Sequence, residues 1–129
     1  MIHLRRFLQS VHHALRGVVL VFRHEQSFRL QMIGAFVVVV LGIWLSIRPT
    51  EWIVILLLIG AVLCLEIINS IFERLVDVLK PRLHPDIRDM KDLMAGCVLV
   101  VSLVALCSGA VIFIPKLIPI VEEILYTVQ

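Results

Sequence analysis

The sequence predicts an all-α integral membrane protein with three transmembrane helices and an N-terminal amphipathic helix on the membrane surface. The first observation is composition: 60% of the 129 residues are hydrophobic, and the mean hydropathy is +1.04, whereas soluble domains are about 45–50% apolar. The second is a set of three apolar stretches, which approach the roughly 20 residues that a spanning helix needs. The third is a basic amphipathic segment before them. We therefore expect one membrane domain over residues 1–129.

The N-terminal segment, residues 2–22, is too polar to span a bilayer. Its apolar side chains recur every three or four residues, while Arg5, His12 and Arg16 occupy other positions. This pattern is typical of an amphipathic helix at a membrane interface. A helix packed on a soluble core shows the same pattern, but the apolar sequence that follows favours the surface helix. The polar residues 22–29, which include Glu25, are expected to form a turn or a helix start.

Three membrane spans are expected to follow, over residues 30–47, 52–79 and 93–114. We expect a turn at residues 48–50, because Pro49 and its polar neighbours stop the first span. The second span is apolar only as far as Leu65, so it needs its polar second half to reach spanning length. Pro115 and Pro119 are expected to end the third span.

The basic residues predict the orientation of the chain. Two of them, Arg48 and Lys116, fall at the outer ends of the spans. Ten precede the first span or lie around the segment between the second and third: Arg5, Arg6, Arg16, Arg23, Arg29, Arg74, Lys80, Arg82, Arg88 and Lys91. Because loops rich in Lys and Arg stay in the cytoplasm, the N-terminus and the long loop are expected there.

Five polar residues share one face of the second span: Glu66, Asn69, Ser70, Glu73 and Asp77. At about 100° per residue, the last four fall within about 60° of the first. One acidic residue at the centre of a membrane helix costs roughly 2.5–3.5 kcal/mol on insertion scales. A helix that keeps three is expected to bind a cation, a proton or a phosphate that offsets them.

The ends of the spans bring further charged residues to the same level. Glu25 precedes the first span, Glu73 is near the inner end of the second, and Lys91 and Asp92 open the third. Two carboxylates and phosphate oxygens are a common way to hold Mg²⁺, and a lysine can neutralise phosphate charge. Glu66 lies about two helical turns deeper, roughly 10 Å along the axis, where it can accept a proton from a lipid hydroxyl. These groups are sufficient for phosphoryl transfer.

Structural alternatives remain open for several of these residues. Asp77 is as well explained by solvation or an ion pair as by function, Asn69 can serve as a polar contact between helices, and His84 can be an ordinary loop residue. The carboxylates can also pair with basic residues of the same bundle, namely Arg74, Arg88 or Lys91.

At these residues the chain resembles the prokaryotic diacylglycerol kinase family, which includes the undecaprenol kinases. The family motif E-x-x-N-[ST]-x-x-E-x-x-x-D corresponds to residues 66–77, and an upstream E-x-x-F-R motif corresponds to residues 25–29. A loop histidine, a Lys-Asp pair and small residues follow at His84, Lys91-Asp92 and Ala95-Gly96. The resemblance covers nearly the whole chain. The departures from the pattern are Ile71-Phe72, Arg82-Leu83 and Leu93-Met94.

The resemblance implies a homotrimeric kinase of the bacterial inner membrane with its active site facing the cytoplasm. It would transfer the γ-phosphate of ATP to the hydroxyl of diacylglycerol or undecaprenol. Glu66 would be the general base and Asn69 would support the catalytic centre, while Glu25 and Glu73 would hold Mg²⁺. The nucleotide contacts would be Arg6, His13, Glu25, Glu73, Asp77, Arg82, Leu83, His84, Lys91 and Asp92. The lipid contacts would be Arg6, Glu66 and Ala95.

Other functional classes fit the sequence less well. A proton- or cation-coupled transport subunit would use the carboxylates as a relay, but they cluster at one membrane level and the third span carries no charge. A non-catalytic assembly protein would not need Glu25, Glu66 and Glu73 together. The expected partners are a membrane lipid, ATP and other copies of the chain, and no nucleic acid.

Overall fold

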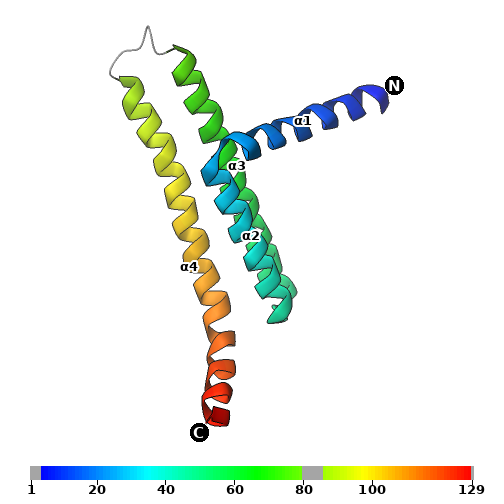
Figure 1. Cartoon of the computed structure of the whole chain (residues 1–129), viewed down its shortest axis with the longest axis vertical. Helices are drawn as coiled ribbons and strands as arrows, with labels where there is room; N and C mark the ends of the chain where they lie inside the picture. Colours follow the sequence, from blue (N-terminus) through cyan, green and yellow to red (C-terminus); the bar gives the residue numbers. More distant parts are fainter. Residues whose placement is uncertain (1–3, 80–85, 129) are drawn as a thin grey trace.

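The structure is a computed structural model that describes residues 4–79 and 86–128, and in these ranges it consists of helices and short connections (Figure 1). The helices are α1 (Leu4–His24), α2 (Gln26–Trp44), α3 (Pro49–Leu79) and α4 (Asp86–Val128). The last three are long and apolar enough to cross a membrane, judged by length and composition. The predicted fold class, three spans after an N-terminal amphipathic helix, is confirmed.

Helices α2, α3 and α4 run lengthwise beside one another, whereas α1 leaves them at a steep angle (Figure 1). Every described residue of α1 before Val21 is exposed, and Val21 is the first to be buried. Apolar residues such as Phe7, Leu8 and Leu15 therefore lack a core to pack on within this chain. That is the arrangement expected of a helix whose apolar face enters a membrane interface.

A single residue separates α1 from α2. Glu25 has an extended backbone, with φ −105° and ψ 117°, and both neighbouring residues are helical. The turn is thus shorter than the predicted polar stretch over residues 22–29, because one extended residue is enough to redirect the chain. The Glu25 carboxylate makes no capping hydrogen bond to α2, so it is available to contact another helix.

The turn between α2 and α3 is a Schellman-type helix end. The Ile47 N–H donates to the Gly42 carbonyl and the Ser46 N–H donates to the Ile43 carbonyl, each at 3.1 Å. Ser46 occupies the left-handed position of this motif, with φ 49°. Gly42 also allows a close approach, because a Cβ there would lie 3.0 Å from the Trp52 ring.

The predicted turn at residues 48–50 is wrong in its placement. Pro49 is the first residue of α3, where its missing N–H is not needed and its fixed φ suits a helix. The Glu51 carboxylate accepts a hydrogen bond from the Arg48 N–H at 2.6 Å, as in a capping box. Glu51 also forms an ion pair with Lys116 of α4 at 3.2 Å, which joins the two helices at this end of the bundle.

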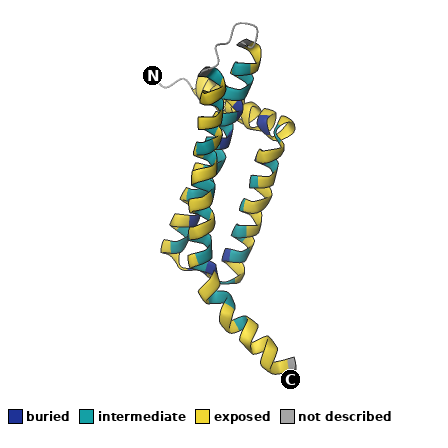
Figure 2. Ribbon diagram, turned by 90° about the vertical axis from the view of Figure 1, so that its left-hand side faces the viewer, coloured by how far each residue is buried: buried dark blue, intermediate teal, exposed yellow. Residues whose placement is uncertain are grey.

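The predicted end of the last helix at Pro115 is also wrong, because α4 continues through Pro115 and Pro119 to Val128. Each proline removes one helical hydrogen bond, but a break in the helix would leave several backbone groups unpaired in apolar surroundings. The C-terminal part of α4 extends past the turn between α2 and α3 and bends away (Figures 1 and 2).

The buried core of the described chain is small. Ile47, Ile55 and Phe113 form its centre near the turn between α2 and α3, and partly buried residues such as Trp52 pack against them. Most other apolar side chains of the three long helices are exposed (Figure 2). Exposed apolar surface of this extent is expected where lipid or another chain covers the helices.

Candidate active site

A polar region lies at the other end of the bundle, where the start of α2, the second half of α3 and the start of α4 meet. Glu66 and Ser70 are its buried members, with exposed fractions of 5% and 2%. The Gln31 side chain donates from Nε2 to Glu66 Oε2 at 2.9 Å. The Ser70 hydroxyl donates to the Glu66 backbone carbonyl at 2.9 Å, which satisfies that hydroxyl within its own helix. The predicted base is therefore buried and held by an amide from α2.

Two buried acceptor atoms in this region have no partner among the described residues. They are Oε1 of Gln31 and Oδ1 of Asn69. A buried polar atom without a hydrogen bond costs roughly 1–3 kcal/mol. Such atoms are rare in folded proteins and indicate a missing donor, such as water, an ion or a ligand. Within residues 4–79 and 86–128, these two acceptors therefore remain open to a hydrogen bond from such a group.

Two ion pairs surround the buried part of the site. Glu25 Oε1 lies 3.1 Å from an Arg74 guanidinium nitrogen, and Glu73 Oε1 lies 3.3 Å from Lys91 Nζ. The ion pairs with Arg74 and Lys91 that the sequence left open are thus present. Glu66 differs from both carboxylates, because its described side-chain partner is a neutral amide. The Glu25 and Glu73 side chains are 25% and 34% exposed, so both can be reached from solvent.

The polar residues of α3 face both neighbouring helices. Glu66 contacts Gln31 of α2. Glu73, about two helical turns further along α3, contacts Lys91 of α4. Burial falls along the same face from Glu66 to Asp77, which is exposed. The stripe thus leads from the interior of the bundle to its surface.

Glu25 and Glu73 are the carboxylates of this region that could hold a magnesium ion together with phosphate oxygens. Among residues 4–79 and 86–128, no three His, Cys, Asp or Glu side chains are grouped to hold a metal. Mg²⁺ in kinases uses one or two carboxylates and completes its shell with water and phosphate oxygens. Glu25 and Glu73 supply two partly exposed carboxylates of this kind, each balanced by a cation.

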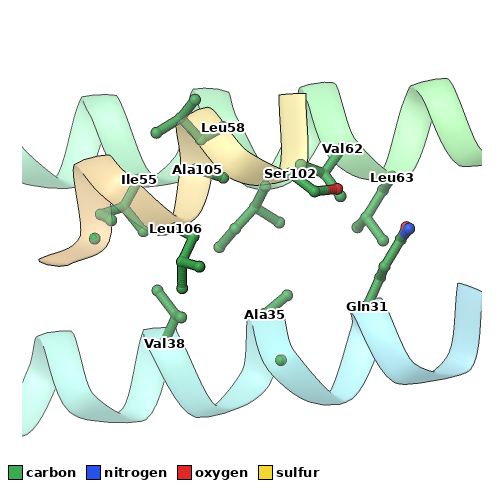
Figure 3. A pocket seen from close by; sticks show the side chains of 13 residues that line it. Gln31, Ala35, Val38, Ile55, Leu58, Val62, Leu63, Ser102, Ala105 and Leu106 are labelled. Atoms are coloured by element: carbon green, nitrogen blue, oxygen red, sulfur yellow. The ribbon is translucent and has the colours of Figure 1, made fainter. Parts of the chain in front are cut away.

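An apolar cavity of about 270 Å³ lies between α2, α3 and α4, and Gln31 stands at one end of it (Figure 3). Its walls include Ala35 and Val38 of α2, Leu63 of α3 and Leu106 of α4. Gln31 reaches from α2 toward Leu63 (Figure 3). The polar region and the apolar interior of the bundle therefore meet at the glutamine that holds Glu66.

Several other predicted site residues do not lie in the polar region formed by their own chain. Arg6 and His13 are exposed on the part of α1 that projects from the bundle, and Ala95 is exposed on α4. Asp92 is exposed and lines an open hollow between α3 and α4 together with Leu65. The predicted loop contacts lie outside the described residues, namely Arg82, Leu83 and His84.

Sequence reasoning did not identify Gln31 as a site residue. Its signal was present, because Gln31 is the one polar side chain in the otherwise apolar stretch from Leu30 to Trp44 of α2. Polar groups in membrane helices are costly and often functional. Arg74 was considered only as one of several cations. Its pairing with Glu25 depends on contact between residues 49 positions apart.

Comparison with known proteins indicates the family of the chain. The profile of the prokaryotic diacylglycerol kinase family matches residues 12–113. An undecaprenol kinase of Bacillus subtilis (strain 168) is 36% identical over 114 residues, which cover 88% of this chain and 93% of the relative. A diacylglycerol kinase of Escherichia coli (strain K12) is 22% identical over 107 residues, which cover 83% and 88%. From the extent of these matches, we conclude that the chain belongs to the prokaryotic diacylglycerol kinase family.

Proposed function

We propose that this membrane lipid kinase transfers the γ-phosphate of ATP to the hydroxyl of a lipid alcohol, with Glu66 as the general base. The observation that carries the proposal is the buried Glu66 carboxylate, held by Gln31 at the meeting point of the polar region and the apolar cavity. A lipid alcohol brings a polar hydroxyl and a hydrocarbon chain, so it matches both sides of this boundary. Membership in a kinase family contradicts the alternative of a transport subunit.

The proposed reaction transfers one proton to Glu66 and one phosphoryl group to the lipid. Gln31 occupies Oε2 of Glu66, which leaves Oε1 to accept the hydroxyl proton of the lipid. The lipid oxygen then forms a bond to the γ-phosphorus as the bond between that phosphorus and the bridging oxygen of ADP breaks. General base catalysis of this kind typically contributes about 10²–10⁴-fold to the rate. Most of the remaining acceleration in phosphoryl transfer comes from positioning and charge stabilisation.

Glu25 and Glu73 are proposed to hold Mg²⁺ together with the ATP phosphates. The ion would neutralise phosphate charge that develops during transfer. Glu73 is seven residues from Glu66 on α3, which is about 10.5 Å along a helix axis, so nucleotide and lipid can approach one site from opposite directions. Lys91, which pairs with Glu73 in the described chain, supplies a cation for the phosphates. Asn69 is proposed to support the centre through its unpartnered acceptor.

The remaining assignments also stay proposals. Nucleotide contacts are proposed at Arg6, His13, Asp77, Asp92 and residues 82–84, and a lipid contact at Ala95. Because Arg6 and His13 lie on the projecting helix α1, they would reach the site of a neighbouring chain more readily than their own. This is one reason for proposing a homotrimer. The excess of basic residues at the Glu25 end supports an inner-membrane protein with that end in the cytoplasm.

The proposed substrates are diacylglycerol and undecaprenol, after which the two relatives are named. The test offers both lipids, in separate vesicles, to the purified chain with labelled ATP and Mg²⁺. We expect phosphorylation of at least one lipid, and kcat/KM compares the two. The variant Glu66→Gln should lower kcat by about 10²-fold or more.

The matched control is Glu122→Gln, which neutralises an exposed carboxylate in the C-terminal part of α4. It should keep the wild-type rate. Phosphorylation of neither lipid would overturn the proposed function. A Glu66→Gln variant that phosphorylates lipid at the wild-type rate would remove Glu66 from the role of base.

A further inference from the structure

We propose that Gln31 is a positioning residue for phosphoryl transfer, because its amide holds one oxygen of Glu66 and thereby directs the other toward the lipid hydroxyl. The inference rests on the proposed kinase function. It adds a residue of α2 to a site whose other proposed residues lie in the motif on α3 or near the ends of the helices. The geometry that supports it is the 2.9 Å hydrogen bond from Gln31 Nε2 to Glu66 Oε2.

The contact matters because Glu66 has few other restraints. Its side chain is buried, and the described structure gives its carboxylate no cationic partner, unlike Glu25 and Glu73. A catalytic base must be held within about 0.5 Å of its productive position to accept a proton efficiently. The Gln31 hydrogen bond links Glu66 to a different helix, so it fixes the carboxylate relative to α2 as well as α3.

The chemical type of residue 31 suits this role. A glutamine amide donates a hydrogen bond without carrying charge, so it orients the carboxylate without competing as an ion-pair partner. A lysine or arginine at the same place would form a charge-assisted pair with Glu66 and reduce its availability as a base. The neutral donor therefore leaves the negative charge of Glu66 for the proton that it must accept.

A purely structural glutamine is a poorer explanation. Polar contacts between membrane helices do contribute to association, on average by about 0.6 kcal/mol in one well-studied protein. Gln31, however, also buries Oε1 without a partner among the described residues, at a cost of roughly 1–3 kcal/mol. An apolar residue would avoid both the amide and its unpaired acceptor at the end of the apolar cavity (Figure 3). The unpaired acceptor offsets at least part of the stability that the contact with Glu66 provides, which favours a function for the side chain.

The test is Gln31→Met, which keeps the length and approximate volume of the side chain and removes the donor. We expect kcat to fall at least about 10-fold, in line with the loss of a residue that orients a reacting group. The KM values for ATP and lipid should stay within about twofold, because the positioned base acts mainly in the transition state. The thermal unfolding midpoint in detergent should stay close to that of the wild type. Gln9→Met, an exposed position on α1, is the matched control and should keep wild-type kinetics.

A second variant covers the case in which Gln31→Met fails to fold. Gln31→Asn keeps an amide but shortens the side chain by one methylene, so it cannot maintain the 2.9 Å contact without movement of the helices. We expect a similar loss of kcat. Wild-type kcat in either folded variant would overturn the inference, as would a loss of kcat fully explained by a smaller folded fraction. A wild-type chain without lipid kinase activity would overturn the proposed function itself, which is a distinguishable result.

Discussion

The ion pair between Glu25 and Arg74 allows a sharp test of whether Glu25 is a metal ligand or only a partner for arginine. The perturbation is a pair of single variants, Glu25→Gln and Arg74→Gln, together with the double variant. Each single variant breaks the same 3.1 Å contact, so a purely structural ion pair predicts similar losses from both. A magnesium ligand predicts a much larger loss from the glutamate variant.

The structure sets the scale of the structural effect. The Arg74 and Glu25 side chains are 40% and 25% exposed, and partly exposed ion pairs contribute about 0.2–1 kcal/mol. This corresponds to no more than about fivefold in an equilibrium constant. Loss of a residue that only orients a metal ligand already costs about 10–100-fold in metal affinity or activity. We therefore expect Glu25→Gln to lower kcat/KM by about 100-fold or more, and Arg74→Gln by less than about fivefold.

The assay measures lipid phosphorylation at a series of Mg²⁺ concentrations, with thermal unfolding in detergent as the check on folding. For Glu25→Gln, half-maximal activation should need at least about 10 times more Mg²⁺, because one carboxylate ligand is lost. For Arg74→Gln, it should stay close to the wild-type value. The double variant should resemble Glu25→Gln.

Equal losses in both single variants, with no further loss in the double variant, would refute the reasoning. That result would show that Glu25 acts through its contact with Arg74. An unchanged Mg²⁺ requirement in Glu25→Gln would lead to the same conclusion by a separate measurement.

Two further predictions concern packing and the second ion pair. Gly42→Ala should lower the free energy of unfolding by about 1–3 kcal/mol, seen as a lower unfolding midpoint, because the added Cβ would meet the Trp52 ring at 3.0 Å. Gly60→Ala is the control, because a Cβ at Gly60 would have nothing within 4 Å. Equal unfolding midpoints for the two variants would contradict the close approach at Gly42. Lys91→Met should change the stability by less than about 1 kcal/mol, since its pair with Glu73 is partly exposed, but should lower kcat/KM for ATP by about 100-fold through loss of phosphate stabilisation. Lys116→Met breaks the ion pair at the other end of the bundle and should keep the catalytic rate; a matching loss there would show that the effect of Lys91 is not specific to the site.

Local signals predicted the helices well and their ends less well. Hydropathy and helical periodicity identified α1, α2 and α3 close to their observed bounds, because both depend on residues a few positions apart. The prolines were misread for a physical reason. Pro49 starts α3 because a helix does not use its first N–H groups, and Pro115 lies within α4 because the remaining backbone stays paired around it.

The sequence alone determined the membrane class, the number of long apolar helices and the polar face of α3, since composition and spacing are properties of single segments. Only the tertiary structure decided which side chains meet. Gln31 and Glu66 are 35 positions apart, and Glu25 and Arg74 are 49 apart. Their contacts depend on how far each helix is rotated and shifted along its neighbour. The period of one helix carries no information on either quantity, so the partner of the proposed base emerged only when the helices were packed together.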